Sequence, residues 1–400
     1  MLDTLEIVGL AILLGFIFGR LFNYFKIPSV AGYVVIGVFL GKSVFNIFHA
    51  DILDNVNILS DIALSVIAIV IGGELRWIHL KRMGKQVFFI VFFEAFFAFF
   101  LVMICVQYYY QNWPLSLILG AISAATAPAA TVLVIKELKS KGKLTNMLMA
   151  VVAIDDGISL IIFCFASAIA KSLIGMGNAI SMISVLEVSF LEIVGAVLMG
   201  IIAGVTISII SRIAKNSDSL LIVVLGTMFM LSGLSRQFGT SMLLANMTLG
   251  IYLVNMMPLL SKKVFSSINK VAPSLFIAFF VTAGAHLRVD VLIDAWKLGL
   301  IYFFARAIGK LSGATLGATI SNFDKKLRRH VGFGLLSQVG VAIGLALVVN
   351  KEFYSLGEEG KQIAVIAVNI LLGTTILTEI IGPIMTKYAL IKSGDAKQIK

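Results

Sequence analysis

The stretch that decides the fold is residues 147–170, with the sequence MLMAVVAIDDGISLIIFCFASAIA. Its charged residues are two adjacent aspartates, Asp155 and Asp156, and apolar side chains flank them on both sides. About 20 predominantly apolar residues are enough for one helix to cross a lipid bilayer. The stretch is therefore predicted to be a membrane-spanning helix that carries a pair of carboxylates close to mid-depth.

The rest of the 400-residue chain has the same character, with 59% hydrophobic residues, 13% charged residues and a mean hydropathy of +1.02. Soluble domains are nearer to about 45–50% apolar and about 25% charged. This composition excludes a soluble enzyme, a nucleic-acid-binding protein and a secreted disulfide scaffold. Because the apolar runs are long and unbroken, they favour helices over the alternating segments of a membrane β-barrel. We expect an all-α polytopic membrane protein.

Apolar stretches between polar breaks predict about thirteen membrane-spanning helices. Lys and Arg residues, which give the chain its net charge of +11, concentrate in alternate loops between them. By the positive-inside rule this pattern predicts an N-terminus outside and a cytoplasmic C-terminus in the cell (inner) membrane. The basic charge is interpreted as a topology signal beside the lipid bilayer, with no nucleic-acid partner. The predicted spans are residues 4–22, 28–46, 58–76, 86–108, 114–136, 147–170, 186–211, 219–235, 240–257, 271–287, 295–320, 331–350 and 361–387.

Two distant segments of the chain resemble each other. Gly72–Leu80 and Gly284–Leu292 share glycine, leucine and arginine at matching positions, and the same spacing sets Thr126 against Gln338. An odd number of predicted spans separates the members of each pair, so the two copies would cross the membrane in opposite directions. This pattern is typical of inverted-topology repeats, which place substrate sites near the midplane where the repeats meet.

Two matched spans contain helix breakers near their centres. Pro128 interrupts the segment Thr126–Thr131, because proline lacks a backbone donor and clashes with the preceding turn. The segment Ser337–Gly344 is polar and rich in glycine at a corresponding depth. Backbone groups freed there must be satisfied by protein or water, since lipid offers no partner. The pair predicts two crossed discontinuous helices whose ends present opposed dipoles at the bilayer centre.

Charged side chains inside the predicted spans cost roughly 2.5–3.5 kcal/mol each and therefore indicate function. Asp155 and Asp156 point about 100° apart on a helix, so each can face a different environment. Carboxylate oxygens suit a hard monovalent cation. Arg306 and Lys310 share one helical face, and the Asp pair supplies the nearest acids available to Lys310. Glu94 is expected to pair with Arg306 as a structural clamp between the repeats.

Other polar residues within the spans receive a structural interpretation. Glu192 and Glu379 are predicted to be packing or gating residues rather than primary ligands. Cys105 and Cys164 lie in apolar runs and are interpreted as packing residues. The four histidines lie near span ends, which argues against a metal site built from histidine.

At these residues the chain resembles the bacterial sodium/proton antiporters of the cation:proton antiporter superfamily, especially the NapA-like and Kef-like branch, over essentially its whole length. The resemblance implies the NhaA-like antiporter fold, and it implies that Asp156 alternately holds Na⁺ or a proton. It also implies that Asp155 forms a salt bridge with Lys310. The first break would contribute Thr126, Ala127 and Thr131 to the lining of the site, and the second break would contribute Ser337 and Gln338. Ala127 departs from the family, which often has an acid at this position, so backbone carbonyls and hydroxyls are expected to serve there instead.

We expect a secondary antiporter that exchanges Na⁺ or Li⁺ for protons by alternating access, electrogenically, without a cofactor, as a homodimer. It is not expected to be an enzyme. A K⁺/H⁺ antiporter or Kef-like potassium efflux protein is the main alternative, although such proteins usually carry a nucleotide-binding domain. A sodium symporter for organic anions, a cation channel and an intramembrane aspartyl protease are weaker alternatives, the last because its two acids would lie on separate spans.

The expected domains follow from this family fold. Spans 4–6 and 11–13 would form a mobile core around the site, and spans 1–3 and 8–10 a scaffold that also forms the dimer. The boundaries are 1–82 and 216–294 for the two halves of the scaffold, 83–172 and 295–390 for the two halves of the core, 173–215 for the linker helix and 391–400 for a cytoplasmic tail.

Overall fold

The computed structural model describes residues 3–25, 28–41, 43–78, 84–176, 182–211, 213 and 217–396. Within these ranges the regular structure is helical and no β-strand occurs. The chain divides into two compact units, which are described separately below. Unit 1 consists of Met1–His49, Met83–Gly175 and Phe280–Lys400, and unit 2 consists of Ala50–Arg82 and Met176–Phe279.

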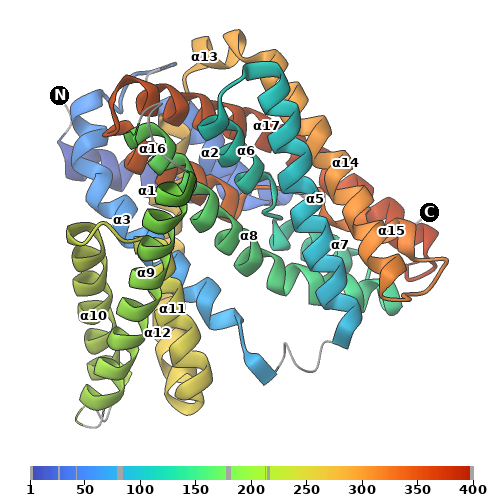
Figure 1. The fold of residues 1–400 in the computed structure, drawn as a ribbon, viewed down its shortest axis with the longest axis horizontal. Helices are drawn as coiled ribbons and strands as arrows, with labels where there is room; N and C mark the ends of the chain where they lie inside the picture. The colour runs from blue at the N-terminus through green and yellow to red at the C-terminus, as the bar shows by residue number, and fades with distance from the viewer. Residues whose placement is uncertain are drawn as a thin grey trace. The chain divides into compact units, whose positions relative to one another are not determined.

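Unit 1 contains the helices that carry every candidate site residue predicted from the sequence (Figure 1). Its longest helices are α8, α17 and α5. The helices are α1 (Thr4–Tyr24), α2 (Ser29–Leu40), α5 (Gly84–Tyr110), α6 (Trp113–Ser123), α7 (Pro128–Glu137), α8 (Lys143–Met176), α13 (Val289–Asp294), α14 (Trp296–Ile320), α15 (Arg328–Val331), the 3₁₀ helix η2 (Gly332–Leu335), α16 (Gly340–Tyr354) and α17 (Gly357–Lys392).

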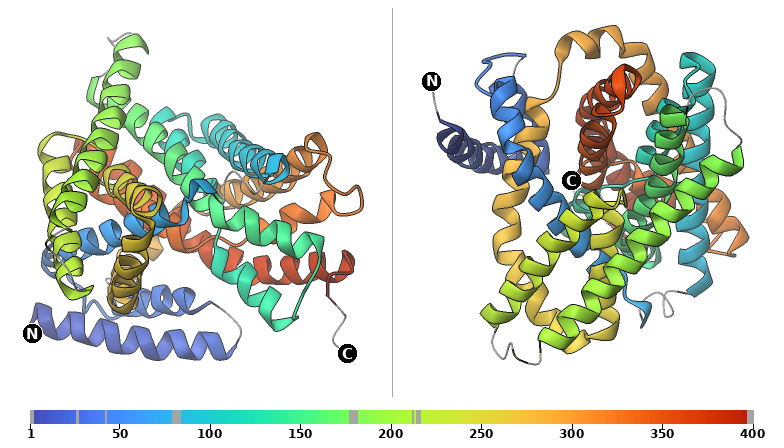
Figure 2. Two further views of the ribbon diagram at one scale, coloured as in Figure 1. Left: turned by 90° about the horizontal axis from the view of Figure 1, so that it is seen from below. Right: turned by 60° about the vertical axis from the view of Figure 1, so that its left-hand side comes forward.

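Unit 2 is a smaller helical assembly in which α11 packs against both α3 and α9. Figure 2 shows α9, α10 and α11 together, in green to yellow. The helices are α3 (Ala50–Glu74), α9 (Met182–Ile210), α10 (Ser217–Gln237), α11 (Met242–Met256) and α12 (Pro258–Ala285), of which α12 continues into unit 1.

Each predicted span coincides with one helix or with a pair of short helices separated by a break. Among the described residues, seven helices are long and apolar enough to cross a membrane, and an eighth span is added if the bent pair Arg328–Leu335 and Gly340–Tyr354 is one crossing. Three shorter apolar helices, α2, α6 and α11, accompany them. The chain is thus an all-helical, multi-pass membrane protein, and the number of thirteen crossings stays a prediction.

Helices α5 and α14 pack more closely than ordinary side chains permit, and they run side by side in Figure 1. Gly309, Gly313 and Gly317 recur at every fourth position along α14. A Cβ atom built on Gly313 would lie 2.4 Å from the carbonyl oxygen of Phe93 and 2.8 Å from the Cα of Glu94. Such contacts let the two backbones meet directly, as in other small-residue helix crossings in membranes. They bring the polar residues of α14 to the polar residue of α5.

Two glycines that the sequence repeat aligns occupy equivalent packing positions. A Cβ atom on Gly72 in α3 would lie 2.1 Å from the carbonyl oxygen of Met247 in α11. A Cβ atom on Gly284 in α12 would lie 2.1 Å from the carbonyl oxygen of Val34 in α2. The same kind of close backbone contact therefore recurs in unit 2 and in unit 1, at positions that the repeat relates.

The start of α8, the helix that carries the Asp pair, is held by the far end of the chain. Oδ2 of Asp395 accepts hydrogen bonds from the backbone N–H of Thr145 at 2.8 Å and from its hydroxyl at 3.0 Å. The carbonyl of Asp395 accepts from Lys141 N and from the Ser140 hydroxyl. A side-chain oxygen that accepts from the first-turn amides stabilises a helix start. The described part of the predicted tail is thus packed onto unit 1.

Candidate ion-binding site

Two unwound segments lie together in the middle of unit 1. The first, residues 124–127, separates α6 from α7, and the second, residues 336–339, separates η2 from α16. The amide of Ala127 donates to the carbonyl of Ser337 at 2.9 Å, and the hydroxyl of Thr131 donates to the carbonyl of Gly334 at 2.7 Å. The chain bends by 52° across the second segment. The structure thus brings together the two interrupted segments predicted from the sequence.

Arg306 on α14 links the two unwound segments. Its side chain is buried, with 1% of the residue surface exposed. The guanidinium donates to the carbonyls of Ser123 at 3.1 Å and Ala125 at 2.8 Å in the first segment. It also donates to the carbonyls of Leu336 at 2.7 Å and Ser337 at 3.4 Å in the second. These carbonyls follow the C-terminal ends of α6 and η2, where helix dipoles favour a positive charge.

Lys310 lies one helical turn further along α14 and is completely buried. Its ammonium group donates to the Ala124 carbonyl and, at 2.9 Å, to the Thr126 hydroxyl. It is 2.6 Å from Oε2 of Glu94 on α5 and 3.4 Å from Oδ2 of Asp155 on α8. The ammonium group of Lys310 therefore lies between two buried carboxylates and the first unwound segment.

The structure corrects the pairing that the sequence suggested for Glu94. That residue was expected to contact Arg306, whereas its carboxylate makes its ion pair with Lys310. Arg306 and Lys310 are one helical turn apart on α14. The guanidinium of Arg306 donates its hydrogen bonds to backbone carbonyls of the two unwound segments, and the ammonium group of Lys310 contacts the Glu94 carboxylate. Glu94 thus belongs to the same polar cluster as Asp155 rather than to a separate clamp.

Asp155 and Asp156 occupy adjacent positions of α8 and have different surroundings. Asp155 is completely buried and faces Lys310, whereas Asp156 keeps 6% of its surface exposed. Adjacent helical residues point about 100° apart, so only one of the two can face α14 directly. The two carboxylates therefore differ in burial, and Asp155 is the one with a recorded contact to the lysine.

Gln338 connects the second unwound segment to the first. Its amide nitrogen donates to the carbonyl of Ile122 at 2.8 Å, and its amide oxygen accepts from the hydroxyl of Tyr302 at 3.1 Å. The backbone carbonyl of Gln338 accepts from the hydroxyl of Thr378 at 3.1 Å. Tyr302 was not among the residues predicted from the sequence, although its position one turn before Arg306 on α14 places it on the face of the polar residues.

The charges buried in this unit do not balance. Buried charged residues in the described part of unit 1 comprise four acids and two bases. The acids are Glu94, Asp155, Asp156 and Glu379, and the bases are Arg306 and Lys310. If all six were ionised, negative charge would be in excess, and an uncompensated buried charge is strongly unfavourable. The arrangement can take up protons, and carboxylate oxygens are ligands that suit a hard monovalent cation.

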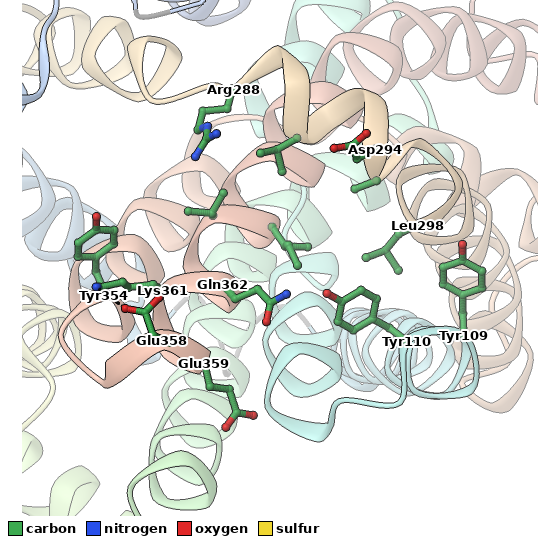
Figure 3. Close-up of a pocket in the computed structure, with 14 residues that line it drawn as sticks. Tyr109, Tyr110, Arg288, Asp294, Leu298, Tyr354, Glu358, Glu359, Lys361 and Gln362 are labelled. Atoms are coloured by element: carbon green, nitrogen blue, oxygen red, sulfur yellow. Dashed lines mark hydrogen bonds and ion pairs between the residues drawn. The ribbon is translucent and has the colours of Figure 1, made fainter.

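A separate pocket of about 780 Å³ lies at one end of unit 1, between α5, α13, α14, α16 and α17. Figure 3 shows Tyr109 and Tyr110 on one side and the acidic pair Glu358 and Glu359 on another. None of the site residues predicted from the sequence is among the described residues that line it. The candidate site is therefore the buried cluster and not this open pocket.

Comparisons with known proteins identify the family of this all-helical membrane protein. A family model described as "Sodium/hydrogen exchanger, transmembrane" matches residues 9–392, and the chain belongs to this family. The expectation of a transporter rather than an enzyme is thereby confirmed.

Two curated relatives match at lower identity. A protein named Na(+)/H(+) antiporter from Enterococcus hirae is 23% identical over 366 residues, which is 91% of this chain and 92% of the relative. Sodium/hydrogen exchanger 8 from Arabidopsis thaliana is 29% identical over 177 residues, which is 40% of this chain and 23% of that longer protein.

The fold is that of a solved archaeal structure. The sodium proton antiporter MjNhaP1 from Methanocaldococcus jannaschii at pH 8 superposes with a TM-score of 0.76 over 97% of this chain and 98% of that one, at 20% sequence identity. An electron-microscopy map of the same antiporter gives a TM-score of 0.73 over 99% of both chains. The family match confirms the resemblance to the cation:proton antiporter superfamily that was predicted from the sequence.

Proposed function

We propose that this chain exchanges Na⁺ or Li⁺ for protons across the cell membrane, and that Asp156 alternately binds the cation and a proton. The excess of buried carboxylates over buried bases carries the proposal, because each excess charge requires a proton or a cation. The relative from Enterococcus hirae, which aligns over nearly the whole chain, is named as a Na⁺/H⁺ antiporter and supports the choice of substrates.

Competition for one carboxylate suffices to couple the two ions. Na⁺ binds Asp156 only when that group is deprotonated, so cation and proton exclude each other. The hydroxyls of Thr126 and Thr131, the backbone at Ala127 and the polar groups of Ser337 and Gln338 line the site with neutral oxygens. The Lys310 contact to Asp155 is longer than its contact to Glu94, so a bound cation can attract Asp155 away from the lysine.

We propose that transport is electrogenic, with two protons exchanged for one Na⁺. Asp156 releases one proton when the cation binds, and Lys310 releases the other when Asp155 leaves it. The Lys310→Gln variant should then respond less to an imposed membrane potential than the wild type. An unchanged voltage dependence would exclude the lysine as a proton carrier.

Alternating access follows from the expected domain arrangement. The whole chain would have thirteen spans, and a mobile core would move against a scaffold. The core would comprise residues 83–172 and 295–390 and would contain two crossed discontinuous helices, and the scaffold would comprise residues 1–82 and 216–294. Residues 173–215 would link them, and the scaffold would form a homodimer. We propose the N-terminus outside and the C-terminus in the cytoplasm, as the distribution of basic residues favours.

The test uses proteoliposomes that contain the purified chain and a preset pH gradient. Addition of Na⁺ or Li⁺ should dissipate the gradient, and the Asp156→Asn variant should abolish this effect. The matched control is Asp290→Asn, because Asp290 is exposed and pairs with Arg288 away from the cluster. A fully active Asp156→Asn variant would contradict the proposal. Replacing Na⁺ by K⁺ in the same vesicles decides between the proposed exchange and a K⁺/H⁺ antiporter.

A further inference from the structure

Two basic segments of the chain meet at one end of unit 1. The first, residues 136–145, runs from the last turn of α7 to the first turn of α8, and the second, residues 321–330, connects α14 to α15. Nζ of Lys143 in the first segment is 3.4 Å from Oδ2 of Asp324 in the second. Lys143, Asn322 and Asp324 also line one pocket of about 540 Å³. The two segments are therefore in contact, and together they are called the basic surface.

Hydrogen bonds hold both segments of the basic surface at defined positions. The carbonyl of Asp395 in the C-terminal tail accepts from the amide of Lys141 at 3.0 Å and from the hydroxyl of Ser140 at 3.1 Å. In the second segment, Nε of Arg328 donates to the carbonyl of Phe323 at 2.8 Å. The basic surface is therefore an ordered part of unit 1.

Positive charge greatly exceeds negative charge on the basic surface. Residues 136–145 and 321–330 contain eight lysines and arginines but only two acids, Glu137 and Asp324. All of these basic side chains are exposed except that of Arg328, which is half-buried. Pairing of each acid with one base would still leave most of the positive charge uncompensated. The surface therefore favours a partner that carries negative charge.

An aromatic pair lies beside the basic surface. The ring of Phe333 on η2 packs edge-on against the ring of Tyr388 on α17, with centroids 5.8 Å apart. Phe333 follows Arg329 by one turn, and Tyr388 precedes Lys392 by one turn. Tyr388 is 46% exposed. Tyrosine is enriched where spans leave the bilayer, and lysine and arginine are enriched beside the cytoplasmic leaflet. This end of unit 1 thus has the composition of a surface at the level of the lipid headgroups.

We propose that the basic surface binds the phosphate groups of anionic phospholipids. A leaflet rich in such lipids has a negative potential that attracts clusters of lysine and arginine next to spans. Lysine binds phosphate as a point charge, and arginine can bind it with two parallel hydrogen bonds. Because two segments distant in the sequence contribute to one surface, the same lipids can contact both of them. This shared contact goes beyond the topology signal that the basic residues supply loop by loop.

A second group of basic residues provides a matched comparison. Lys262, Lys263 and Lys270 are exposed on α12, within unit 2. These three lysines belong to a single helix, whereas the basic surface combines two segments. We therefore expect anionic lipid to bind the basic surface more strongly than this part of α12.

Thermal unfolding of the purified full chain in detergent, with phosphatidylglycerol or phosphatidylcholine added, tests the proposal. A ligand that binds only the folded state raises the unfolding temperature. We expect the anionic lipid to raise it more than the zwitterionic lipid does. The triple variant Lys325→Gln/Lys326→Gln/Arg329→Gln should lose about half of this difference or more. The variant Lys325→Arg/Lys326→Arg/Arg329→Lys keeps all three charges and should retain the difference.

Three outcomes would overturn the proposal. Equal effects of the two lipids would exclude recognition of the anionic headgroup. An equal loss in the control Lys262→Gln/Lys263→Gln/Lys270→Gln would show that the lipid does not prefer the basic surface. The same rise with inorganic phosphate alone would identify a soluble anion as the ligand. Ionic strength is varied with choline chloride, which leaves Na⁺ constant, and the effect of the anionic lipid should shrink as the salt concentration rises.

Hydrogen exchange of the wild type keeps the proposal testable if the variants do not fold. Bound headgroups should slow amide exchange in residues 136–145 and 321–330 when phosphatidylglycerol replaces phosphatidylcholine, with residues 262–270 as the reference. The slowing should include the first turn of α8, the helix that carries the Asp pair. Unchanged exchange in both segments would overturn the proposal. None of these measurements requires transport, so their result is independent of the proposed function.

Discussion

Lys310 forms a completely buried ion pair with Glu94, whose Oε2 is 2.6 Å from the ammonium nitrogen, closer than the 3.4 Å that separates the same nitrogen from Asp155. The pair joins α14 to α5 at the place where the two backbones are in contact. Lys310 therefore has two acidic neighbours, one on α5 and one on α8, and the acid on α5 is the nearer of the two.

The first prediction concerns this pair. Replacement of Lys310 leaves Glu94 and Asp155 buried without the cation that faces them, and an unpaired buried charge typically costs about 3–5 kcal/mol. We expect Lys310→Met to lower the free energy of unfolding by an amount of this order. Thermal unfolding of the purified protein in detergent measures the effect.

The double variant Glu94→Gln/Lys310→Met provides the control for this prediction, because it removes both charges and keeps similar volumes. It should be more stable than Lys310→Met, because only Asp155 then lacks the cation. If the double variant is less stable than Lys310→Met by the full cost of Glu94→Gln measured alone, the two residues are not energetically coupled.

The second prediction concerns the contact between α14 and α5. Gly313→Ala would place a Cβ atom 2.4 Å from the carbonyl oxygen of Phe93, so the helices must separate. Overpacking of this kind costs about 1–3 kcal/mol, and here it would also lengthen the Lys310 to Glu94 contact. Gly299→Ala on the same helix is the control, because its nearest neighbour lies at an ordinary 3.6 Å. Equal unfolding temperatures for the two variants would contradict the prediction.

Much of the helical architecture was predictable because lipid imposes a simple rule on sequence. Every apolar stretch of sufficient length had to become a helix, and proline or clustered glycine had to interrupt two of them. Helix ends were less predictable. The helix α12 begins at Pro258 rather than near residue 271, and α3 begins at Ala50 rather than near residue 58. Hydropathy detects the apolar part of a helix, so the polar first turns of these two helices were predicted to be loops.

The sequence indicates which charged residues lie inside the spans better than it indicates how they pair. Buried charge is costly in a membrane, so Asp155, Asp156 and Lys310 are candidate site residues because of their positions within apolar stretches. The partner of Glu94 depended on how α5 and α14 are rotated about their axes, which sequence spacing does not specify. The contact of α17 with the 336–339 segment, in which the Thr378 hydroxyl donates to the Gln338 carbonyl, joins distant parts of the chain and was likewise not predictable from spacing.

The third prediction concerns a loop outside the spans. The amide of Lys326 donates to the Asp324 carboxylate at 3.1 Å, and this hydrogen bond, with a smaller effect from Lys143, holds the pKa of Asp324 below its ordinary value of 3.8. A lowered pKa means that the contribution to stability is present above the pKa of the unfolded chain and is lost as the pH falls through the folded value. Asp324→Asn should therefore lower the unfolding temperature slightly at pH 7 and match the wild type in acid. A difference that does not change with pH would contradict this assignment.

The fourth prediction concerns Arg306. Arg306→Lys keeps the positive charge but loses the planar fork that reaches carbonyls in both unwound segments. Each hydrogen bond lost from a charged donor contributes about 1.5–3 kcal/mol, so we expect a lower unfolding temperature and at least a tenfold loss of Na⁺-driven proton movement. Hydrogen exchange should also quicken in residues 124–127 and 336–339. Arg329→Lys, at an exposed position of α15, is the control. If Arg306→Lys leaves amide hydrogen exchange unchanged in both segments, the positive charge alone is sufficient to hold them together and the guanidinium geometry is not required.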